Sequence, residues 1–285
     1  MVKGGSKMLL FFNNAWHENK DIFPILARLS SGQALFETIH YQDGVLYFWE
    51  KHLKRMEQSL AFFKAAVDWP DLKSIILQKL ENADCRSARV KLVCTLPFEG
   101  RTSQLIPTDF LILIEFLPEK QSVTASVRLK TMDSPFNPEV ALLQHKTINY
   151  GYHFYFKGLA QQEGFDDVLY LHPKGFLMET SMANIIGVKG DKLFTPPSSV
   201  GLLPGIVRSV LIQELEVIET KIHKNEIAAF DYFFLTSSVR ELRFVEQIDR
   251  WTFAAEHKRH FLQIERSWQV IKQEYRARQR SHSQS

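Results

Sequence analysis

The sequence predicts an α/β protein of two domains. Its 285 residues are about twice the size of a common domain, which leaves room for two separate cores. Stretches whose apolar residues recur at every second position are interleaved with stretches whose apolar residues recur at every third or fourth, the patterns of strands and helices. The polar segment 118–122 follows a predicted strand, so we place the domain boundary there. We therefore expect a smaller N-terminal α/β domain, residues 1–120, and a larger C-terminal α/β domain, residues 121–285.

The N-terminal domain is predicted to be a sheet with two helices. A turn of Gln42, Asp43 and Gly44 joins two alternating stretches and predicts a β-hairpin. At Trp49 the apolar period changes to three and four, which predicts an amphipathic helix, and Asp71 is placed to cap a second helix. The expected strands are 8–12, 34–40, 45–49, 88–96 and 110–117, and the expected helices begin at residue 49 and cover 72–80.

The C-terminal domain is predicted to mix short strands with three helices. Turns at Lys174-Gly175 and Gly190-Asp191 separate strands, and Gly164 fits the C-cap of the first helix. The expected strands are 123–129, 167–171, 176–179, 184–189, 192–195, 217–222 and 232–236, and the expected helices are 152–162, 206–214 and 253–275. The final segment, RARQRSHSQS, is predicted to be a frayed and solvated end.

Composition and charge argue against several classes of protein. Lys plus Arg total 35 and Asp plus Glu total 32, so a nucleic-acid-binding surface is not expected. Cys85 and Cys94 have neither metal-site nor disulfide spacing, which favours packing roles in a reducing cytoplasm. No apolar run approaches the roughly 18 to 20 residues that span a membrane, and His257 and His260 lack acidic or cysteine neighbours. We expect a cytoplasmic protein with no metal, no membrane span and no nucleic-acid partner.

Lys146 stands out as a candidate nucleophile. It follows the apolar approach VALLQH and precedes TINYGYHFYF, which contains no compensating acid. Burial or a nearby positive group would lower the pKa of such a lysine, and the neutral amine attacks a carbonyl to form a Schiff base. An ordinary solvated amine is the alternative.

Two further features predict a phosphate site. Pro204 and Gly205 open an apolar helix, which leaves the amides of Ile206 and Val207 without intrahelical acceptors. Such a helix start binds phosphate through backbone N–H groups and the helix dipole. The hydroxyls of segment 236–238 follow a strand and can also bind phosphate. Each feature has a plain structural alternative, a loop-to-helix junction in one case and a capped turn in the other.

Glu179 ends the apolar run FLM, at a strand end where a carboxylate needs a partner. A protonated pyridine nitrogen is one such partner, and the carboxylate would keep the ring cationic and therefore an effective electron sink. A structural salt bridge is the alternative.

The order and spacing of these segments resemble the class IV, or fold-type IV, pyridoxal-phosphate enzymes: branched-chain aminotransferases, D-amino-acid aminotransferases and 4-amino-4-deoxychorismate lyases. The family pattern is a lysine, a G-x-D-[DE] strand start, E-x-x-x-x-N, T-P and L-x-G-[IV]-x-R. The corresponding segments here are Lys146, 164–167, 179–184, 195–196 and 203–208. FETI at 36–39, HLKRM at 52–56 and LTSSVREL from Leu235 resemble the family's F-E-[TG]-I-R, H-x-x-R-L and T-[SG]-[TS]-x-x-E-[IV].

The resemblance implies a two-domain enzyme whose C-terminal domain is a pseudo-barrel, which binds pyridoxal 5'-phosphate (PLP) and forms a homodimer. It implies that Lys146 forms the Schiff base and then carries the substrate's α-proton as general acid and base. Glu179 would hold the pyridine nitrogen. The other implied cofactor-binding residues are Arg55, Asn184, Gly205, Ile206, Val207, Ser237 and Ser238. Val207 replaces the hydroxyl residue of many members, so only backbone contacts to phosphate are expected at that position.

Substrate recognition is where the chain departs from the family. The resemblance places Ser31 and Phe36 on the substrate side, but Ser31 replaces an aromatic residue. Arg101 lies in a loop whose counterpart supplies a substrate-carboxylate arginine in D-amino-acid aminotransferases, and a solvated loop arginine is equally expected. Tyr150, four residues after Lys146, is a candidate contact to the cofactor's phenolate oxygen.

The predicted function is PLP-dependent transamination between an amino acid and a 2-oxo acid through a Lys146 Schiff base. 4-Amino-4-deoxychorismate lyase, which releases pyruvate in the synthesis of 4-aminobenzoate and folate, is the alternative, since no residue separates transfer from elimination. A non-catalytic PLP- or phosphate-ligand-binding protein is an alternative of another class.

Overall fold

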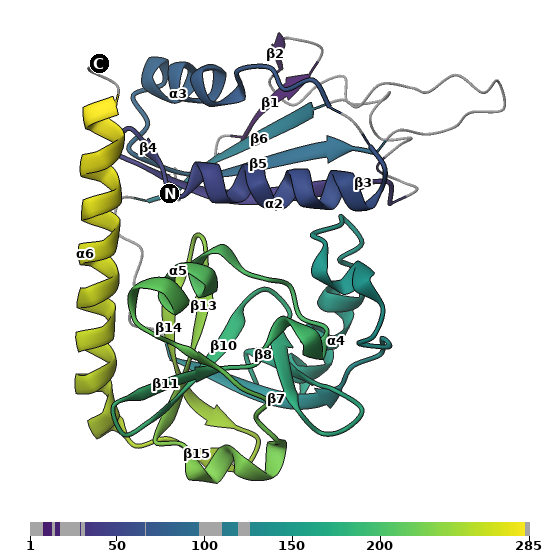
Figure 1. Cartoon of the computed structure of the whole chain (residues 1–285), viewed down its shortest axis with the longest axis vertical. Helices are drawn as coiled ribbons and strands as arrows, with labels where there is room; N and C mark the ends of the chain where they lie inside the picture. Colours follow the sequence, from purple (N-terminus) through teal and green to yellow (C-terminus); the bar gives the residue numbers. More distant parts are fainter. Residues whose placement is uncertain are drawn as a thin grey trace, which may run out of the picture. The chain divides into compact units, whose positions relative to one another are not determined.

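The structure is a computed structural model, and it describes residues 8–12, 15–17, 29, 32–65, 67–96, 110–118 and 126–282. The chain divides into two compact units (Figure 1), and each is described by itself. Unit 1 comprises Met1–Gln121, Lys146–Asn149 and Tyr275–Ser285, and unit 2 comprises Ser122–His145 and Tyr150–Glu274. The predicted boundary between residues 120 and 121 lies outside the described residues. No described helix is long and apolar enough to cross a membrane.

Unit 1 is an antiparallel sheet with two helices. Its six strands lie in the order β2-β1-β6-β5-β3-β4. The strands are β1 Met8–Phe12, β2 Ala15–His17, β3 Ala34–Gln42, β4 Val45–Leu46, β5 Ser87–Thr95 and β6 Phe110–Phe116, and the helices are α2 Trp49–Phe62 and α3 Leu72–Asn82. Asp71 caps α3, because its side chain accepts a hydrogen bond from the Ser74 amide at 3.1 Å.

The alternation along β3 decides which residues enter the core of unit 1. Leu35, Ile39 and Tyr41 pack with the apolar stripes of α2 and α3, whereas Phe36, Thr38 and His40 point to the other face. Phe36 therefore lies on the sheet face opposite the helices. Cys94 joins the core, and neither cysteine forms a disulfide, which fits the packing role predicted for them.

The segment that carries Lys146 extends this sheet. The Phe36 amide donates to the Lys146 carbonyl at 2.8 Å, and the Ile148 amide donates to the Ala34 carbonyl at 3.0 Å. An antiparallel bridge joins Leu35 and Thr147 between these two bonds. Lys146–Asn149 thus belongs to unit 1, although the sequence suggested that it lay within the second domain.

Unit 2 is a mixed sheet that closes on itself. Its strands follow the order β12-β11-β10-β13-β14-β7-β8-β9, with β15 beside β14, and β9 pairs back to β10. The closed ring is the pseudo-barrel expected for the C-terminal domain. The strands are β7 Val127–Asp133, β8 Asp167–Leu171, β9 Leu177–Thr180, β10 Asn184–Lys189, β11 Lys192–Thr195, β12 Ile218–Glu219, β13 Tyr232–Ser237, β14 Glu241–Ile248 and β15 Trp251–Thr252.

Three helices complete the described part of the chain after residue 126, which also contains short 3-10 turns. They are α4 Gly151–Gln162, α5 Ile206–Glu214 and α6 Lys258–His282. The barrel core is built from apolar side chains of β7, β8, β10, β13 and β14. A second cluster, which includes Ala160, Tyr170 and Met178, packs α4 on the strands. Gly164 has a φ of 84° just after α4, as its predicted C-cap position requires.

The structure confirms most of the predicted elements and corrects several. The strands 167–171, 184–189 and 192–195 and the helix 206–214 have the predicted bounds. The predicted strand 45–49 is wrong beyond Leu46, because α2 begins at Trp49, and the predicted strand 217–222 shrinks to Ile218–Glu219. Strand β14 was not predicted, since its polar residues hide the apolar alternation. Residues 276–282 are helical rather than frayed, and Arg276 lies 3.6 Å from Asp43.

Candidate active site

Lys146 is fixed by its backbone at the edge of β3, and its side chain lies over an aromatic ring. The ammonium nitrogen is 4.4 Å from the centroid of the Phe36 ring, a cation–π distance. Phe36 is buried and Lys146 is half-buried. The predicted nucleophile and the predicted substrate-side residue Phe36 are therefore in contact within unit 1.

A second lysine shares the same ring. The ammonium of Lys91, on β5, lies 4.2 Å from the Phe36 centroid. Burial lowers the pKa of Lys91, and the positive charges of Lys146 and Arg89 lower it further. Sequence patterns did not reveal this neighbour, because only the pairing of β3 with β5 brings Lys91 beside Phe36.

Arg55 is held rigidly inside unit 1. Its Nε and Nη2 atoms donate to the two carboxylate oxygens of Glu37, at 2.7 and 2.5 Å, and His52 Nδ1 lies 2.6 Å from Glu37 Oε2. Burial alone would raise the pKa of Glu37, but Arg55 and His52 together lower it to about 2. Burial also lowers the pKa of His52, against the attraction of Glu37.

This buried cluster was missed from the sequence, although two signals for it were present. Glu37 lies between Leu35 and Ile39 on the apolar face of β3, and a carboxylate buried there has to find a partner. His52 and Arg55 stand three residues apart on α2, which places both on one helix face.

Glu179 lies where the barrel of unit 2 closes. Its Cα is paired with that of Asn184 between β9 and β10. Glu179 Oε1 accepts a hydrogen bond from the Leu203 amide at 2.9 Å, and Oε2 accepts one from Asn184 Nδ2 at 3.1 Å. Asn184 Nδ2 also donates to the Leu203 carbonyl at 2.9 Å. The two predicted residues, Glu179 and Asn184, are therefore directly linked.

The start of α5 lies beside this network. Gly205 is the N-cap residue with φ −67°, and no side chain caps the helix. The first intrahelical bond runs from the Ser209 amide to the Gly205 carbonyl at 2.9 Å, so the amides before Ser209 have no intrahelical acceptor. A Cβ atom at position 205 would lie 2.0 Å from Asn184 Oδ1, so the close approach requires glycine.

A buried hydroxyl without a partner lies near the same helix start. Thr236 Oγ1 is buried and has no hydrogen-bond partner in the described part of the chain. Thr236 is the Cα partner of Asn184 between β13 and β10. A buried polar atom normally has a partner, so an unpaired one indicates a missing ligand or water.

Ser237 and Ser238, the serines predicted to bind phosphate, follow Thr236 directly in the sequence. Ser237 is the last residue of β13, and Ser238 begins the turn to β14. Both side chains are half-buried, and neither hydroxyl is bonded to another described residue. The end of β13 therefore offers hydroxyl donors and the start of α5 offers amide donors, both within unit 2. Phosphate groups bind to donors of these two types.

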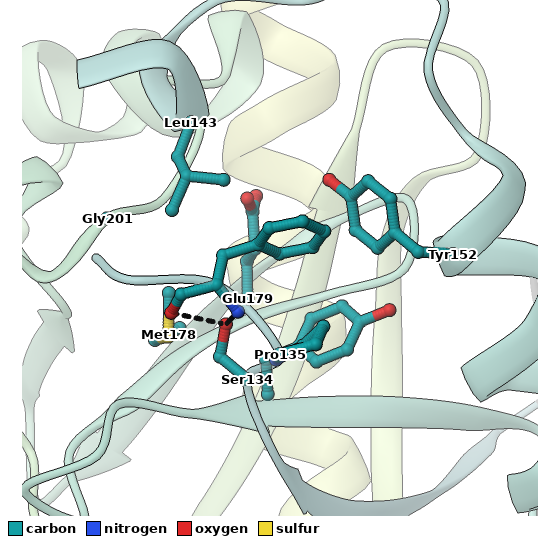
Figure 2. A pocket seen from close by; sticks show the side chains of 9 residues that line it. Ser134, Pro135, Leu143, Tyr152, Met178, Glu179 and Gly201 are labelled. Atoms are coloured by element: carbon teal, nitrogen blue, oxygen red, sulfur yellow. Dashed lines mark hydrogen bonds between the residues drawn. The ribbon is translucent and has the colours of Figure 1, made fainter. Parts of the chain in front are cut away.

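A small pocket adjoins Glu179 in unit 2 (Figure 2). Figure 2 shows Glu179 and Tyr152 on its wall, with Ser134, Leu143 and Met178. Burial and the charge of Glu179 raise the pKa of Tyr152, so its phenol stays protonated. Tyr150, the predicted cofactor contact, does not line this pocket, and its ring lies 4.6 Å from that of His153. Tyr152 is the tyrosine of α4 that shares the pocket wall with Glu179.

Arg208, the last residue of the L-x-G-[IV]-x-R segment, has a structural role. Its Nε donates to Thr195 Oγ1 at 3.2 Å and its Nη2 donates to the Pro196 carbonyl at 2.7 Å and to Glu219. The guanidinium therefore links α5 to the Thr195-Pro196 segment. The T-P motif and the arginine of the L-x-G-[IV]-x-R motif are thus in direct contact.

The predicted site residues fall into two sets. Unit 1 holds Lys146, Arg55 and Phe36, and unit 2 holds Glu179, Asn184, Gly205, Ile206, Val207, Ser237, Ser238 and Tyr150. Ser31 and Arg101 lie outside the described residues. The donors of unit 2 fit the phosphate of PLP, because an uncapped helix start and the unpaired Thr236 hydroxyl occur together. Glu179 is a carboxylate, the kind of group that can partner a protonated pyridine nitrogen.

Comparisons with known proteins identify the family. A family model described as amino-transferase class IV matches residues 34–248. The aminodeoxychorismate lyase of Bacillus subtilis (strain 168) is 24% identical over 256 residues, which cover 82% of this chain and 84% of the relative. Branched-chain amino acid aminotransferase 2, chloroplastic, of Humulus lupulus is 37% identical over 101 residues, 33% of this chain and 25% of the relative.

A solved structure shares the fold. The branched-chain amino acid aminotransferase of T.th., complexed with N-(5'-phosphopyridoxyl)-L-glutamate, superposes with a TM-score of 0.76 at 20% identity. The superposition covers 87% of this chain and 88% of that chain.

Proposed function

Because the chain belongs to the class IV amino-transferase family, we propose that it uses PLP attached to Lys146 to move an amino group between an amino acid and a 2-oxo acid. The fold is the two-domain α/β fold of fold-type IV enzymes, and enzymes of this family are PLP-dependent aminotransferases or related lyases. The assignment of Lys146 as the residue that holds PLP rests on its position in unit 1. Its backbone is fixed by β3, and its amine lies over Phe36.

Lys146 and Glu179 have different roles in the proposed reaction. When bound, PLP supplies an electron sink for the bond-breaking step at the substrate's α-carbon. Lys146 binds the cofactor carbonyl and afterwards moves the α-proton as base and acid. Glu179, whose carboxylate is fixed by Leu203 and Asn184, holds the pyridine nitrogen in its protonated form.

We assign the phosphate of PLP to backbone amides and to side-chain donors. The amides at the start of α5, at Ile206 and Val207, face an anion with the positive end of the helix dipole. Ser237 and Ser238 add hydroxyls, and Arg55 adds a guanidinium whose orientation Glu37 fixes. Val207 contributes only its backbone, because its side chain cannot donate.

The lyase is the second candidate function. The B. subtilis relative that spans most of this chain carries that name, and elimination of pyruvate uses the same lysine and the same electron sink. No described residue separates transfer from elimination, so product analysis has to decide.

The setting of the enzyme is also part of the proposal. We propose a homodimer in the cytoplasm whose partners are small amino acids and 2-oxo acids. The family resemblance supports the dimer, and two cysteines that form no disulfide fit a reducing compartment.

Purified protein incubated with PLP tests the assignment. We expect a yellow protein in which borohydride fixes the cofactor mass on Lys146, and Lys146→Ala should lose both the colour and the turnover. Lys192→Ala, at an exposed position of β11, is the matched control.

Products then separate the candidates. Glutamate or alanine formed from a panel of 2-oxo acids supports transamination, whereas pyruvate released from aminodeoxychorismate supports the lyase. Cofactor attachment without either product would indicate a non-catalytic PLP-binding protein. A Lys146→Ala protein with unchanged colour and turnover would refute the assignment of Lys146.

A further inference from the structure

Glu241, the glutamate of the LTSSVREL segment, has no role in the proposed function. It is the first residue of β14, and its Cα is paired with that of Ser237 at the end of β13. The three residues between them form a turn. Glu241 therefore closes the hairpin that carries both serines assigned to the phosphate, and we call residues 237–241 the serine turn.

The backbone of Glu241 has an unfavourable conformation. Its φ is 51°, in the left-handed region that glycine adopts more readily than any other residue. A hairpin loop of three residues commonly needs one residue in this conformation. A residue with a side chain stays there only when the surrounding contacts hold it. The contacts of Glu241 therefore determine whether the serine turn keeps its shape.

Helix α6 supplies these contacts. Glu241 Oε2 accepts hydrogen bonds from Trp268 Nε1 at 3.0 Å and from Gln269 Nε2 at 2.9 Å. Glu241 Oε1 accepts a hydrogen bond from Lys272 Nζ, which completes a buried ion pair. Trp268 and Lys272 are both buried, and the three donors belong to unit 2 together with the serine turn. Both oxygens of the carboxylate are thus held by donors of one helix, two of which are buried.

The shape of the serine turn matters for binding an anion. The hydroxyls of Ser237 and Ser238 can serve one phosphate only if both point to the same place. If Glu241 left the left-handed region, the path of the chain through the turn would change and the two hydroxyls would separate. Donors that are fixed before the ligand arrives bind it more tightly, because less conformational freedom is lost on binding.

We propose that α6, acting through Glu241, holds the serine turn in the shape that binds the cofactor phosphate. The proposal rests on the proposed function for the assignment of Ser237 and Ser238 to the phosphate. Trp268, Gln269 and Lys272 are positioning residues, because they act on the phosphate through Glu241 and the turn.

A comparison of PLP with pyridoxal, which lacks the phosphate, tests the proposal. Each aldehyde is titrated into the full-length protein, and quenching of tryptophan fluorescence gives its Kd whether or not a Schiff base forms. We expect Lys272→Met to weaken PLP binding by about tenfold and to leave pyridoxal binding within about twofold, because pyridoxal has no phosphate for the serine turn to bind. Lys130→Met breaks the more exposed ion pair with Glu163 in unit 2, and this matched control should change neither Kd.

Two double variants separate the shape of the turn from the charge of Lys272. Glu241→Gly/Lys272→Met and Glu241→Ala/Lys272→Met lose the same charges and the same contacts with α6. Only glycine adopts a φ of 51° without strain. We therefore expect the glycine protein to bind PLP about threefold more tightly than the alanine protein, although glycine is the poorer residue in a strand. Thermal unfolding of both proteins shows that each is folded.

Three results would overturn the proposal. Equal losses of PLP and pyridoxal affinity in Lys272→Met would show that the contacts of Glu241 support the fold in general, and so would an unchanged Kd for PLP. An alanine protein that bound PLP as tightly as the glycine protein would show that the shape of the turn is not what α6 controls.

Failure of the proposed function gives a different result. If Lys272→Met weakens the binding of PLP alone but borohydride fixes no cofactor on Lys146, the serine turn binds the phosphate and the assignment of Lys146 is wrong. If borohydride fixes both PLP and pyridoxal on Lys146 and Lys272→Met affects them equally, the proposed function stands and this inference fails.

Discussion

The two units fix their charged groups in different ways. In unit 1 the fixed group is the cation of Arg55, which is held by the side chain of Glu37, itself in contact with His52. In unit 2 the fixed group is the anion of Glu179, which is held by the Leu203 amide and by Asn184. Breaking a buried pair of side-chain charges leaves one charge buried and unpaired, whereas a carboxylate bound by amides loses its contacts one at a time. The difference teaches that changes at the Glu37–Arg55 pair should act mainly on stability, and changes at Glu179 mainly on chemistry.

Glu37→Gln should have the largest effect and should act on stability. Removing the charge leaves Arg55 buried without its partner, so we expect a loss of about 3–5 kcal/mol in the free energy of unfolding. Chemical denaturation of the original and variant proteins measures this loss.

The pH dependence provides a check on Glu37→Gln. The pKa of Glu37 is about 2 in the folded protein against an ordinary 4.5, so its contribution is present above pH 4.5 and is lost as the pH falls towards 2. The variant should lack this part of the acid sensitivity. Identical acid unfolding of both proteins would contradict the ion-pair account, and Glu115→Gln, on a half-buried pair, is the control.

Glu179→Gln should have the next largest effect, and it should act on turnover. Glutamine keeps the size of the side chain but cannot hold a protonated pyridine nitrogen by charge. We expect kcat to fall by about 10²–10³-fold, the range for loss of one preorganised electrostatic group, while borohydride still fixes the cofactor on Lys146. Glu163→Gln, at an exposed position paired with Lys130, should leave kcat unchanged. A Glu179→Gln protein that lost stability rather than turnover would contradict the difference drawn between Glu179 and the Glu37–Arg55 pair.

Gly205→Ala should have a smaller effect that depends on Asn184. The new methyl group would lie 2.0 Å from Asn184 Oδ1, so we expect a loss of about 1–3 kcal/mol in stability and weaker cofactor binding. In Asn184→Ala/Gly205→Ala the clash is absent, so the two losses should not add. Gly158→Ala, in α4 with open space around it, should be neutral or stabilising. Additive losses in the double variant would show that the helix start fails for another reason.

Asp71→Ala should have the smallest effect. It removes the cap of α3 in unit 1, which costs about 1 kcal/mol and shifts the denaturation midpoint only slightly. Cofactor attachment and kcat should not change. A change in either would mean that unit 1 influences the chemistry through more than its charged groups.

Sequence patterns predicted the local elements well, because their signals are local. The period change at Trp49, the cap at Asp71 and the glycine at 164 were enough to place helices. The family resemblance implied that Glu179 and Asn184 share one site, and the structure joins the two side chains by a direct hydrogen bond.

The remaining contacts depend on strand register, which single-sequence patterns do not encode. Lys91 meets Phe36 only because β5 pairs with β3 in one register, and a shift of one residue would turn Lys91 into the core. Thr236 lies opposite Asn184 for the same reason. The roles of Arg55, Ser237 and Ser238 stay predictions, since they depend on the cofactor itself.

The pairing of Glu179 with Asn184 also bears on how the barrel folds. Only a short turn separates the two, and the Thr180 amide already donates to the Ala183 carbonyl at 2.8 Å, so this hairpin closes at little entropic cost. The parallel pairing of β14 with β7 joins segments from opposite ends of unit 2 and must form against a far larger loss of chain entropy. We therefore expect the hairpin that carries the acid to assemble early, before the ring of strands around it is complete.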